Sequence, residues 1–188
     1  MIAYSPRYDQ ALAFAAQAHH TQLRKGTSIP YIAHVVHVSV ILMRHGFSED
    51  LAVAGLLHDV IEDCGVEAAT VAAQFGAEVA RLVVAVSEPK GTVSWEAAKT
   101  AKIAFLATGG PDVAALKAAD AIHNVQSILA DLDRIGDAIW SRFKRGAQPT
   151  LWYYNEIVAK VQQWLPTHPI TAELVAVVAR LDERIRTA

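Results

Sequence analysis

The sequence predicts an all-α protein, and three observations support this prediction. Its 188 residues include 34 alanines, the residue with the highest helix propensity, but only 10 glycines and 7 prolines. Apolar residues recur with the helical period of about 3.6 residues along nearly the whole chain. No segment shows the sustained alternation of apolar and polar residues that is typical of a half-buried strand.

Length and composition predict a single domain. A chain of 188 residues is long enough for one domain and short for two. Hydrophobic residues make up 53% of the chain, which is enough to form one core. No linker rich in glycine, serine or proline divides the chain, and no internal repeat is present. We therefore expect residues 1–188 to form one bundle of about ten helices, without a second domain of usual size.

Capping residues, glycines and prolines indicate where the helices begin and end. Ser48 is a favourable N-cap, and Glu49 and Asp50 suit the positive end of the helix dipole that follows. Gly76 ends one helix, and the segment Glu88 to Ser94, which contains a proline and a glycine, is expected to be a loop. Helices are expected at Tyr8–His19, Ala33–Arg44, Glu49–Ile61, Val66–Phe75, between Gly76 and Val86, and at Trp95–Ala107, Val113–Ile135, Ala138–Phe143, Leu151–Trp164 and Ile170–Ile185.

Charge and cysteine content exclude several classes of protein. A formal net charge of -2 argues against electrostatic binding to nucleic acid or to an anionic membrane. Residues 26–43 lack Lys, Arg, Asp and Glu, but polar residues shorten their apolar part to about three helical turns, so we expect a buried helix there and no membrane span. No basic run precedes the first apolar stretch, and the single cysteine, Cys64, excludes a disulfide framework. We expect a cytoplasmic protein, and the sequence gives no indication of its oligomeric state.

The first polar cluster follows an apolar helix and consists of His58, Asp59, Glu62 and Asp63. Positions i and i+4 share a helix face, so His58 is expected beside Glu62, and Asp59 beside Asp63. An adjacent imidazole and carboxylate suit Mn, Fe or Zn. The alternative is a solvated helix end, although acids there oppose the helix dipole. The cluster alone leaves both interpretations open.

A second polar cluster forms a stripe on a later helix. Asp120, Asn124 and Ser127 stand at positions i, i+4 and i+7, surrounded by apolar residues. An aspartate in an alanine-rich helix is rarely buried unless it is paired or binds a metal. Because the same helix carries Lys117 and Gln126, a solvent-facing stripe is the stronger interpretation when this cluster is considered alone.

A third cluster combines cations, a hydroxyl group and a histidine. Arg24 and Lys25 precede Gly26 and Thr27, and His34 opens the apolar helix that follows. Two cations beside a glycine and a hydroxyl can bind an anion, and an arginine can also stack on a nucleotide base. A solvated turn and a histidine that belongs to the core are the competing interpretations.

Considered together, the clusters resemble the hydrolase domain of the RelA/SpoT proteins, and most closely the stand-alone small alarmone hydrolases. His34, His58-Asp59 and Asp120 follow the order and approximate spacing of an HD-domain metal site. The H…HD…D pattern is shared by many phosphohydrolases, whereas RKxxxxPYxxH combined with HDxxED is much more specific. The resemblance extends from about His19 to Trp164 through AHHTQLRKGTSIPYIAH (18–34), GLLHDVIED (55–63), FGAEV (75–79), AADAIHNVQS (118–127), WSRF (140–143) and WYY (152–154).

This resemblance implies an all-α HD domain with one divalent metal ion, usually manganese, and a nucleotide substrate. The implied activity is hydrolysis of (p)ppGpp at its 3′-diphosphate to pyrophosphate and GDP or GTP. The implied metal ligands are His34, His58, Asp59 and Asp120, with Glu62 and Asp63 as catalytic residues. Implied contacts to the nucleotide are Arg24, Lys25, Thr27, Asn124 and Ser127, with Lys99, Lys102, Arg142 and Lys144 as weaker candidates for the polyphosphate.

The chain departs from the family pattern at three positions. Ala121 stands where the family often has lysine, Gln126 where it often has arginine, and Cys64 where threonine is common. The two missing cations leave open an adenosine analogue of the alarmone or another 3′-phosphorylated nucleotide as substrate. A different HD-type enzyme, such as a 5′-nucleotidase, and a nucleotide sensor without activity also stay open. The intact Glu62-Asp63 pair argues against a sensor, and a purely structural helical module would leave the polar clusters unexplained.

Overall fold

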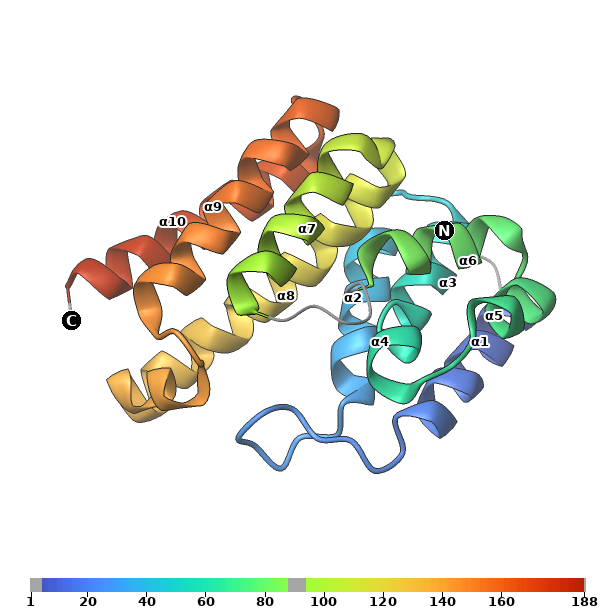
Figure 1. Ribbon diagram of the computed structural model, residues 1–188, viewed down its shortest axis with the longest axis horizontal. Helices are drawn as coiled ribbons and strands as arrows, with labels where there is room; N and C mark the ends of the chain where they lie inside the picture. The colour runs from blue at the N-terminus through green and yellow to red at the C-terminus, as the bar shows by residue number, and fades with distance from the viewer. Residues whose placement is uncertain (1–4, 88–93, 188) are drawn as a thin grey trace.

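The computed structural model describes residues 5–87 and 94–187, and within these ranges it confirms the all-α prediction (Figure 1). The described residues form ten α-helices and one 3-10 helix, and the single β-bridge among them joins Leu23 and Pro30. The helices are α1 (Pro6–Ala18), α2 (Ile32–Arg44), α3 (Glu49–Leu57), α4 (Val60–Cys64), α5 (Ala68–Phe75), α6 (Ala77–Val86), α7 (Trp95–Thr108), α8 (Gly110–Ile135), η1 (Gly136–Arg142), α9 (Ala147–Trp164) and α10 (Pro169–Arg186).

Several helix ends follow the expected capping chemistry. The Ser48 hydroxyl accepts a hydrogen bond from the backbone N–H of Leu51 at 3.3 Å, which confirms Ser48 as the N-cap of α3. Of the loop expected at 88–94, only Ser94 belongs to the described residues, and it caps α7 by accepting from the N–H of Ala97 at 3.1 Å. The expected starts of α3 and α7 therefore agree with the structure, whereas α1, which Ser5 caps, begins at Pro6, two residues before the expected Tyr8.

Two expected helices differ most from the structure, whereas α8 and α9 only begin earlier than expected, at Gly110 instead of Val113 and at Ala147 instead of Leu151. The helix expected at Glu49–Ile61 ends at Leu57, and α4 begins only at Val60. Asp59 has φ −105° and ψ −2°, far from helical values near −63° and −42°, so the helical hydrogen bonding is interrupted between the two helices. The helix expected at Ala138–Phe143 is a 3-10 helix, because Gly136 at φ 57° ends α8 and leaves only a short, tightly wound segment behind it.

The long helix α8 organises the bundle. Figure 1 shows α7, α9 and α10 alongside α8 in one half of the molecule, with α1–α6 gathered in the other. α8 contacts α9 and α10 on one side and α2, α3 and α6 on the other, so it links both halves. Every residue of α3 from Leu51 to Leu57 is buried, so the segment that follows α3 starts inside the core. No helix in the described parts of the chain combines the length and apolar character needed to cross a bilayer.

Candidate metal centre

Three parts of the chain bring four polar side chains together inside the bundle. His34 comes from the first turn of α2, His58 and Asp59 from the break between α3 and α4, and Asp120 from the middle of α8. His34 Nε2 lies 3.3 Å from Asp120 Oδ1 and 3.7 Å from Asp59 Oδ2. His58 Nε2 lies 2.9 Å from Asp59 Oδ2 and 3.8 Å from Asp120 Oδ1. Two imidazole nitrogens and two carboxylate oxygens therefore face one point, and we call these four residues the HD cluster.

Burial and donor chemistry fit a divalent metal ion. His34 is 1% exposed and His58 is 3% exposed, and the side chain of Asp120 is 13% exposed. The ligand atoms of His34, His58 and Asp120 all lie within 4.8 Å of one another. Imidazole nitrogen combined with carboxylate oxygen suits Mn, Fe or Zn, so these residues form a candidate metal site.

His58 Nε2, the nitrogen that faces Asp59 and Asp120, makes no well-aligned hydrogen bond with the described residues, and this is the clearest indication that a partner is missing from the HD cluster. His58 Nδ1 lies 2.9 Å from the carbonyl oxygen of Gly55, and because a carbonyl only accepts, Nδ1 carries a proton and donates. Within the described structure, the buried Nε2 has no hydrogen-bond partner, although Asp59 Oδ2 lies close by. Buried polar atoms are normally satisfied, so a bound cation would give this nitrogen the partner that it lacks.

The electrostatics of the HD cluster also favour a cation. Burial opposes a charge on His58, but the negative charges of Asp59 and Asp120 outweigh burial and raise the pKa of His58 to about 9. Burial likewise opposes ionisation of Asp59, yet the attraction of His58 holds the pKa of Asp59 below its ordinary value. The cluster therefore stabilises positive charge at its centre, either as a proton on His58 or as a metal ion.

Each member of the HD cluster is held by a separate contact from outside it. The hydroxyl of Tyr31 donates to Asp59 Oδ2 at 2.6 Å. Lys117 Nζ donates to Asp120 Oδ2 at 2.7 Å, while the amide of Asn124 donates to Asp120 Oδ1. Such outer contacts fix the orientation of ligands in metal sites.

The sequence pattern did not identify the roles of Lys117 and of His123, whose Nδ1 lies 2.7 Å from His34 Nδ1. Both stand three residues from Asp120 along α8, on the face that Asp120 shares. Helical spacing from Asp120 was the signal that could have found them.

The two acids that follow the HD cluster have different partners. Both carboxylate oxygens of Glu62 accept from Lys102 Nζ, the shorter contact being 2.9 Å. Asp63 Oδ2 accepts from the neutral amide of Gln22 at 2.7 Å. Burial, followed by the charge of Asp59, raises the pKa of Asp63. Asp63 is therefore more basic than an ordinary aspartate, whereas Glu62 is paired with a cation.

The loop before α2 brings Arg24 to the edge of the HD cluster. The guanidinium of Arg24 donates to Asn124 Oδ1 at 2.7 Å and lies 5.5 Å from the centre of the Tyr31 ring. Thr27 donates its hydroxyl proton to the carbonyl oxygen of Arg24 at 2.9 Å, which shapes the turn, and Lys25 is exposed. The structure therefore brings Arg24 and Asn124 together beside Asp120, as one continuous polar chain from the loop to the cluster.

The other predicted contacts lie in several places. Lys99 Nζ is 5.0 Å from the centre of the Tyr153 ring, over which Lys117 also lies. Ser127 donates its hydroxyl proton to the carbonyl oxygen of His123 at 2.8 Å. Arg142 pairs with Asp131 at 2.6 Å, and Lys144 is exposed. Lys99 and Lys117, which pairs with Asp120, therefore lie over the same Tyr153 ring. Ser127 and Arg142 instead contact residues of α8.

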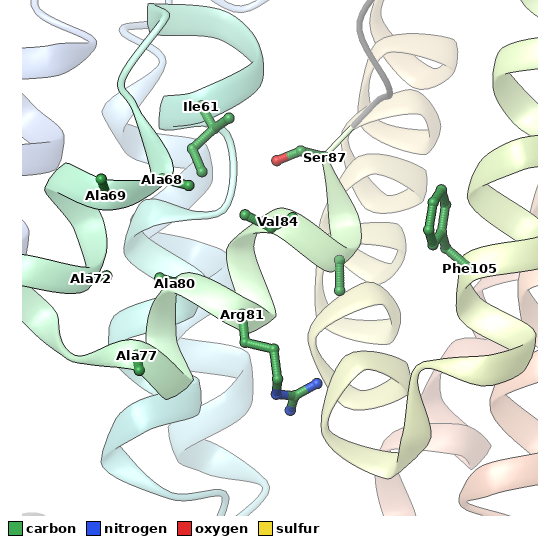
Figure 2. Close-up of a pocket in the computed structure, with 11 residues that line it drawn as sticks. Ile61, Ala68, Ala69, Ala72, Ala77, Ala80, Arg81, Val84, Ser87 and Phe105 are labelled. Carbon is green, nitrogen blue, oxygen red and sulfur yellow. The ribbon is translucent and has the colours of Figure 1, made fainter.

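An apolar cavity of about 720 Å³ lies elsewhere, between α4, α5, α6 and α7. Figure 2 shows Val84 of α6 and Phe105 of α7 at this cavity, with small alanine side chains from α5 and α6 around it. Its one charged lining residue, Arg81, is paired with Glu78 at 2.6 Å. The cavity contains no member of the HD cluster and brings together no acid–base groups.

Comparisons with known proteins agree with the geometry. The HD-domain family matches residues 11–146 of the chain. Human MESH1, a guanosine-3′,5′-bis(diphosphate) 3′-pyrophosphohydrolase, is 34% identical over 138 residues, which are 72% of this chain and 74% of MESH1. Four other curated relatives are much longer, and the chain spans only 15% to 22% of their length.

Solved structures show the same relationship. The crystal structure of lmo0812 from Listeria monocytogenes matches with a TM-score of 0.72 and 38% identity, over 77% of this chain and 96% of that chain. A metazoan ortholog of SpoT that hydrolyses ppGpp matches with a TM-score of 0.81 and 25% identity, over 96% of this chain and 98% of that chain. The chain therefore belongs to the HD-domain family and resembles, within it, the small MESH1-like ppGpp hydrolases.

Proposed function

We propose that this protein is a manganese-dependent 3′-pyrophosphohydrolase of guanosine 3′,5′-bis(diphosphate) and its pentaphosphate counterpart, with residues 1–188 acting as one catalytic domain. The observation that carries this proposal is the HD cluster, in which two histidines and two aspartates face one point, with Asp63 one turn beyond Asp59. The likeness to MESH1 and to the metazoan SpoT ortholog supports the choice of substrate. The products would be pyrophosphate and GDP or GTP.

The HD cluster would hold the metal ion through His34, His58, Asp59 and Asp120. A divalent ion held in this way activates water as a nucleophile and polarises a phosphoryl oxygen. Manganese suits two imidazole nitrogens combined with two carboxylates. The Nε2 of His58, which is buried and makes no well-aligned hydrogen bond in the described part of the chain although Asp59 Oδ2 lies 2.9 Å away, supports its assignment as a ligand.

Asp63 would act as the general base. Its raised pKa makes its carboxylate a better proton acceptor than an ordinary aspartate. As water attacks the phosphorus bonded to the ribose 3′-oxygen, Asp63 accepts the proton of the water, the bond from phosphorus to the 3′-oxygen breaks, and pyrophosphate leaves. The nucleoside 3′-oxygen then takes up a proton. Glu62, held by Lys102, would orient the attacking water.

Arg24 and Lys25 would bind the nucleoside end of the substrate. Arg24 already lies over the Tyr31 ring and contacts Asn124, so its planar guanidinium is positioned to stack on a base. Asn124 would contact the ribose, with Thr27 and Ser127 nearby on the same side. Lys99 and Arg142 would contribute positive charge toward the phosphates.

The double change Glu62→Gln with Asp63→Asn tests the catalytic assignment. It removes both carboxylates while preserving their size, so Mn²⁺ and nucleotide binding should stay largely intact. Loss of a general base should lower kcat by about 10²–10⁴-fold. A pyrophosphate-release assay gives kcat, and calorimetry with Mn²⁺ and with the nucleotide gives binding. Turnover within about tenfold of wild type would contradict the base assignment, and loss of Mn²⁺ binding would make these acids ligands.

An adenosine 3′-diphosphate substrate is the second candidate. The two positions where the family often carries a cation are Ala121, which is 1% exposed, and Gln126, which is exposed. Neither can supply positive charge to a phosphate. Incubating the Mn²⁺-loaded protein with guanosine and adenosine 3′-diphosphates separates the two substrates. Release of orthophosphate instead of pyrophosphate would indicate a different HD-type phosphohydrolase, and nucleotide binding without turnover would indicate a sensor.

A further inference from the structure

We infer that His123 is a positioning residue, which fixes the proton of His34 on Nδ1 and thereby presents the Nε2 lone pair of His34 to the metal ion. This inference rests on the proposed role of His34 as a metal ligand. His34 Nδ1 and His123 Nδ1 are 2.7 Å apart, so one of them donates a hydrogen bond to the other.

The direction of this hydrogen bond follows from the other side of the His34 ring. His34 Nε2 faces Asp120 Oδ1 at 3.3 Å and Asp59 Oδ2 at 3.7 Å, and it must carry a lone pair in order to bind a metal. A neutral imidazole then has its proton on Nδ1. Nδ1 of His34 therefore donates, and His123 Nδ1 accepts. His123 must itself be neutral, with its own proton on Nε2.

Ring contacts constrain the plane of the His123 ring. Its ring stacks on His37 with a centroid distance of 4.7 Å and an interplanar angle of 21°. The His34 and His123 ring centroids are 4.9 Å apart. His34 and His37 lie one turn apart on α2, so α2 contacts the His123 ring at two points. Asp120, three residues before His123 on α8, is on the same helix face. One face of α8 thus carries both Asp120, a proposed ligand, and His123, the residue that orients the second proposed ligand, His34.

The two histidines of the HD cluster are oriented in different ways. His58 donates from Nδ1 to the backbone carbonyl of Gly55 in the last turn of α3, a contact that no substitution of another side chain removes. His34 depends on a side chain from another helix. The orientation of His34 can therefore be changed by substituting one residue that does not face the metal point.

A matched pair of substitutions isolates the hydrogen bond from the packing. In His123→Asn the side-chain oxygen stands near the position of Nδ1 and can still accept. His123→Leu keeps much of the volume but has no acceptor. Loss of such an outer contact typically weakens metal binding about 10–100-fold. We therefore expect His123→Leu to bind Mn²⁺ about 10–100-fold more weakly than wild type, and His123→Asn to bind it within about threefold.

Calorimetric titration of the metal-free proteins with Mn²⁺ measures these affinities without reference to catalysis. His20→Leu is the control, because His20 is exposed and its ring contacts only the carbonyl oxygen of Gln17 among the described interactions. Thermal unfolding of each metal-free variant reports whether it is folded. Wild-type protein that binds no Mn²⁺ would overturn the metal proposal and this inference together.

Three further outcomes separate the two claims. A folded His123→Leu protein that binds Mn²⁺ as tightly as wild type would overturn the inference and leave the metal proposal standing. Equal weakening in His123→Leu and His123→Asn would show that the shape of the histidine matters, and it would overturn the hydrogen-bonding role. If His123→Leu does not fold, His123→Asn still decides, because a loss of more than about tenfold there contradicts the expected rescue.

Discussion

The HD cluster and the apolar cavity between α4 and α7 are opposite kinds of site. In the HD cluster, two histidines with 1% and 3% exposure lie against two carboxylates, and each side chain has its own outer contact. In the cavity, Val84 and Phe105 remain 49% and 50% exposed among alanines. Burying polar and charged groups opposes folding unless they are paired, whereas a partly exposed apolar side chain costs little. Convergence of buried polar groups is therefore a better guide to the candidate metal site than the size of a cavity.

The largest effect on the HD cluster is expected from Asp120→Ala. It removes a carboxylate oxygen from the HD cluster and leaves Lys117, whose side chain is 12% exposed, without its partner at 2.7 Å. We expect the bound metal to fall from one equivalent to a small fraction after dialysis, and the free energy of unfolding to fall by about 3–5 kcal/mol. Metal analysis and urea denaturation measure the two effects. Asp112→Ala, at an exposed position in the first turn of α8, is the control. A full equivalent of metal on Asp120→Ala would show that Asp120 is not a ligand.

A smaller effect is expected from Arg24→Ala at the edge of the HD cluster. The change removes the contacts of the guanidinium with Tyr31 and Asn124, and with them the proposed stacking on the base. If Arg24 binds the nucleoside equally in the ground state and the transition state, KM should rise by about tenfold or more while kcat stays within a few-fold. Steady-state kinetics test this expectation, with the exposed Arg180→Ala as control. A large fall in kcat at constant KM would instead place Arg24 among the groups that stabilise the transition state.

The smallest effect is expected at the apolar cavity. Val84→Thr keeps the shape of a side chain that is 49% exposed, so the free energy of unfolding should change by no more than about 0.5 kcal/mol. The Mn²⁺ affinity should be unchanged, because no residue of the HD cluster lines the cavity. Urea denaturation and Mn²⁺ titration provide the measurements. A tenfold change in Mn²⁺ affinity would show that the cavity and the HD cluster are coupled, and the two sites could then no longer be contrasted as independent.

The sequence predicted the fold better than it predicted the local breaks. Alanine content and helical periodicity report on whole segments, so the all-α class and most helix ends were recovered, including the Ser48 cap. The interruption after Leu57 was missed because Val60 and Ile61 continue the apolar character of α3, and periodicity does not register a change in backbone angles at a single residue such as Asp59.

For the candidate site, the sequence supplied the residues of the motif but not their partners. His34, His58, Asp59 and Asp120 stand at recognisable spacings, and the structure brings them together. His123 carries no such signal, because a histidine next to an asparagine on an alanine-rich helix has many ordinary explanations. Its contact with His34 joins residues that are 89 positions apart, and it depends on how α2 packs against α8. Contacts of this kind follow from tertiary packing, which spacing along the chain does not encode.

The break between α3 and α4 has a further consequence for metal binding. In an uninterrupted helix, consecutive side chains point about 100° apart around the axis. At the break, His58 Nε2 and Asp59 Oδ2 are only 2.9 Å apart, so these two neighbouring residues would act as a single chelating unit toward the proposed metal ion. Folding of α3 and α4 already aligns these two donors, so the conformational entropy of aligning them is not lost a second time when an ion binds. The proposed metal ion would therefore meet two donors that are already aligned, and ordering of the chain would offset less of its binding free energy.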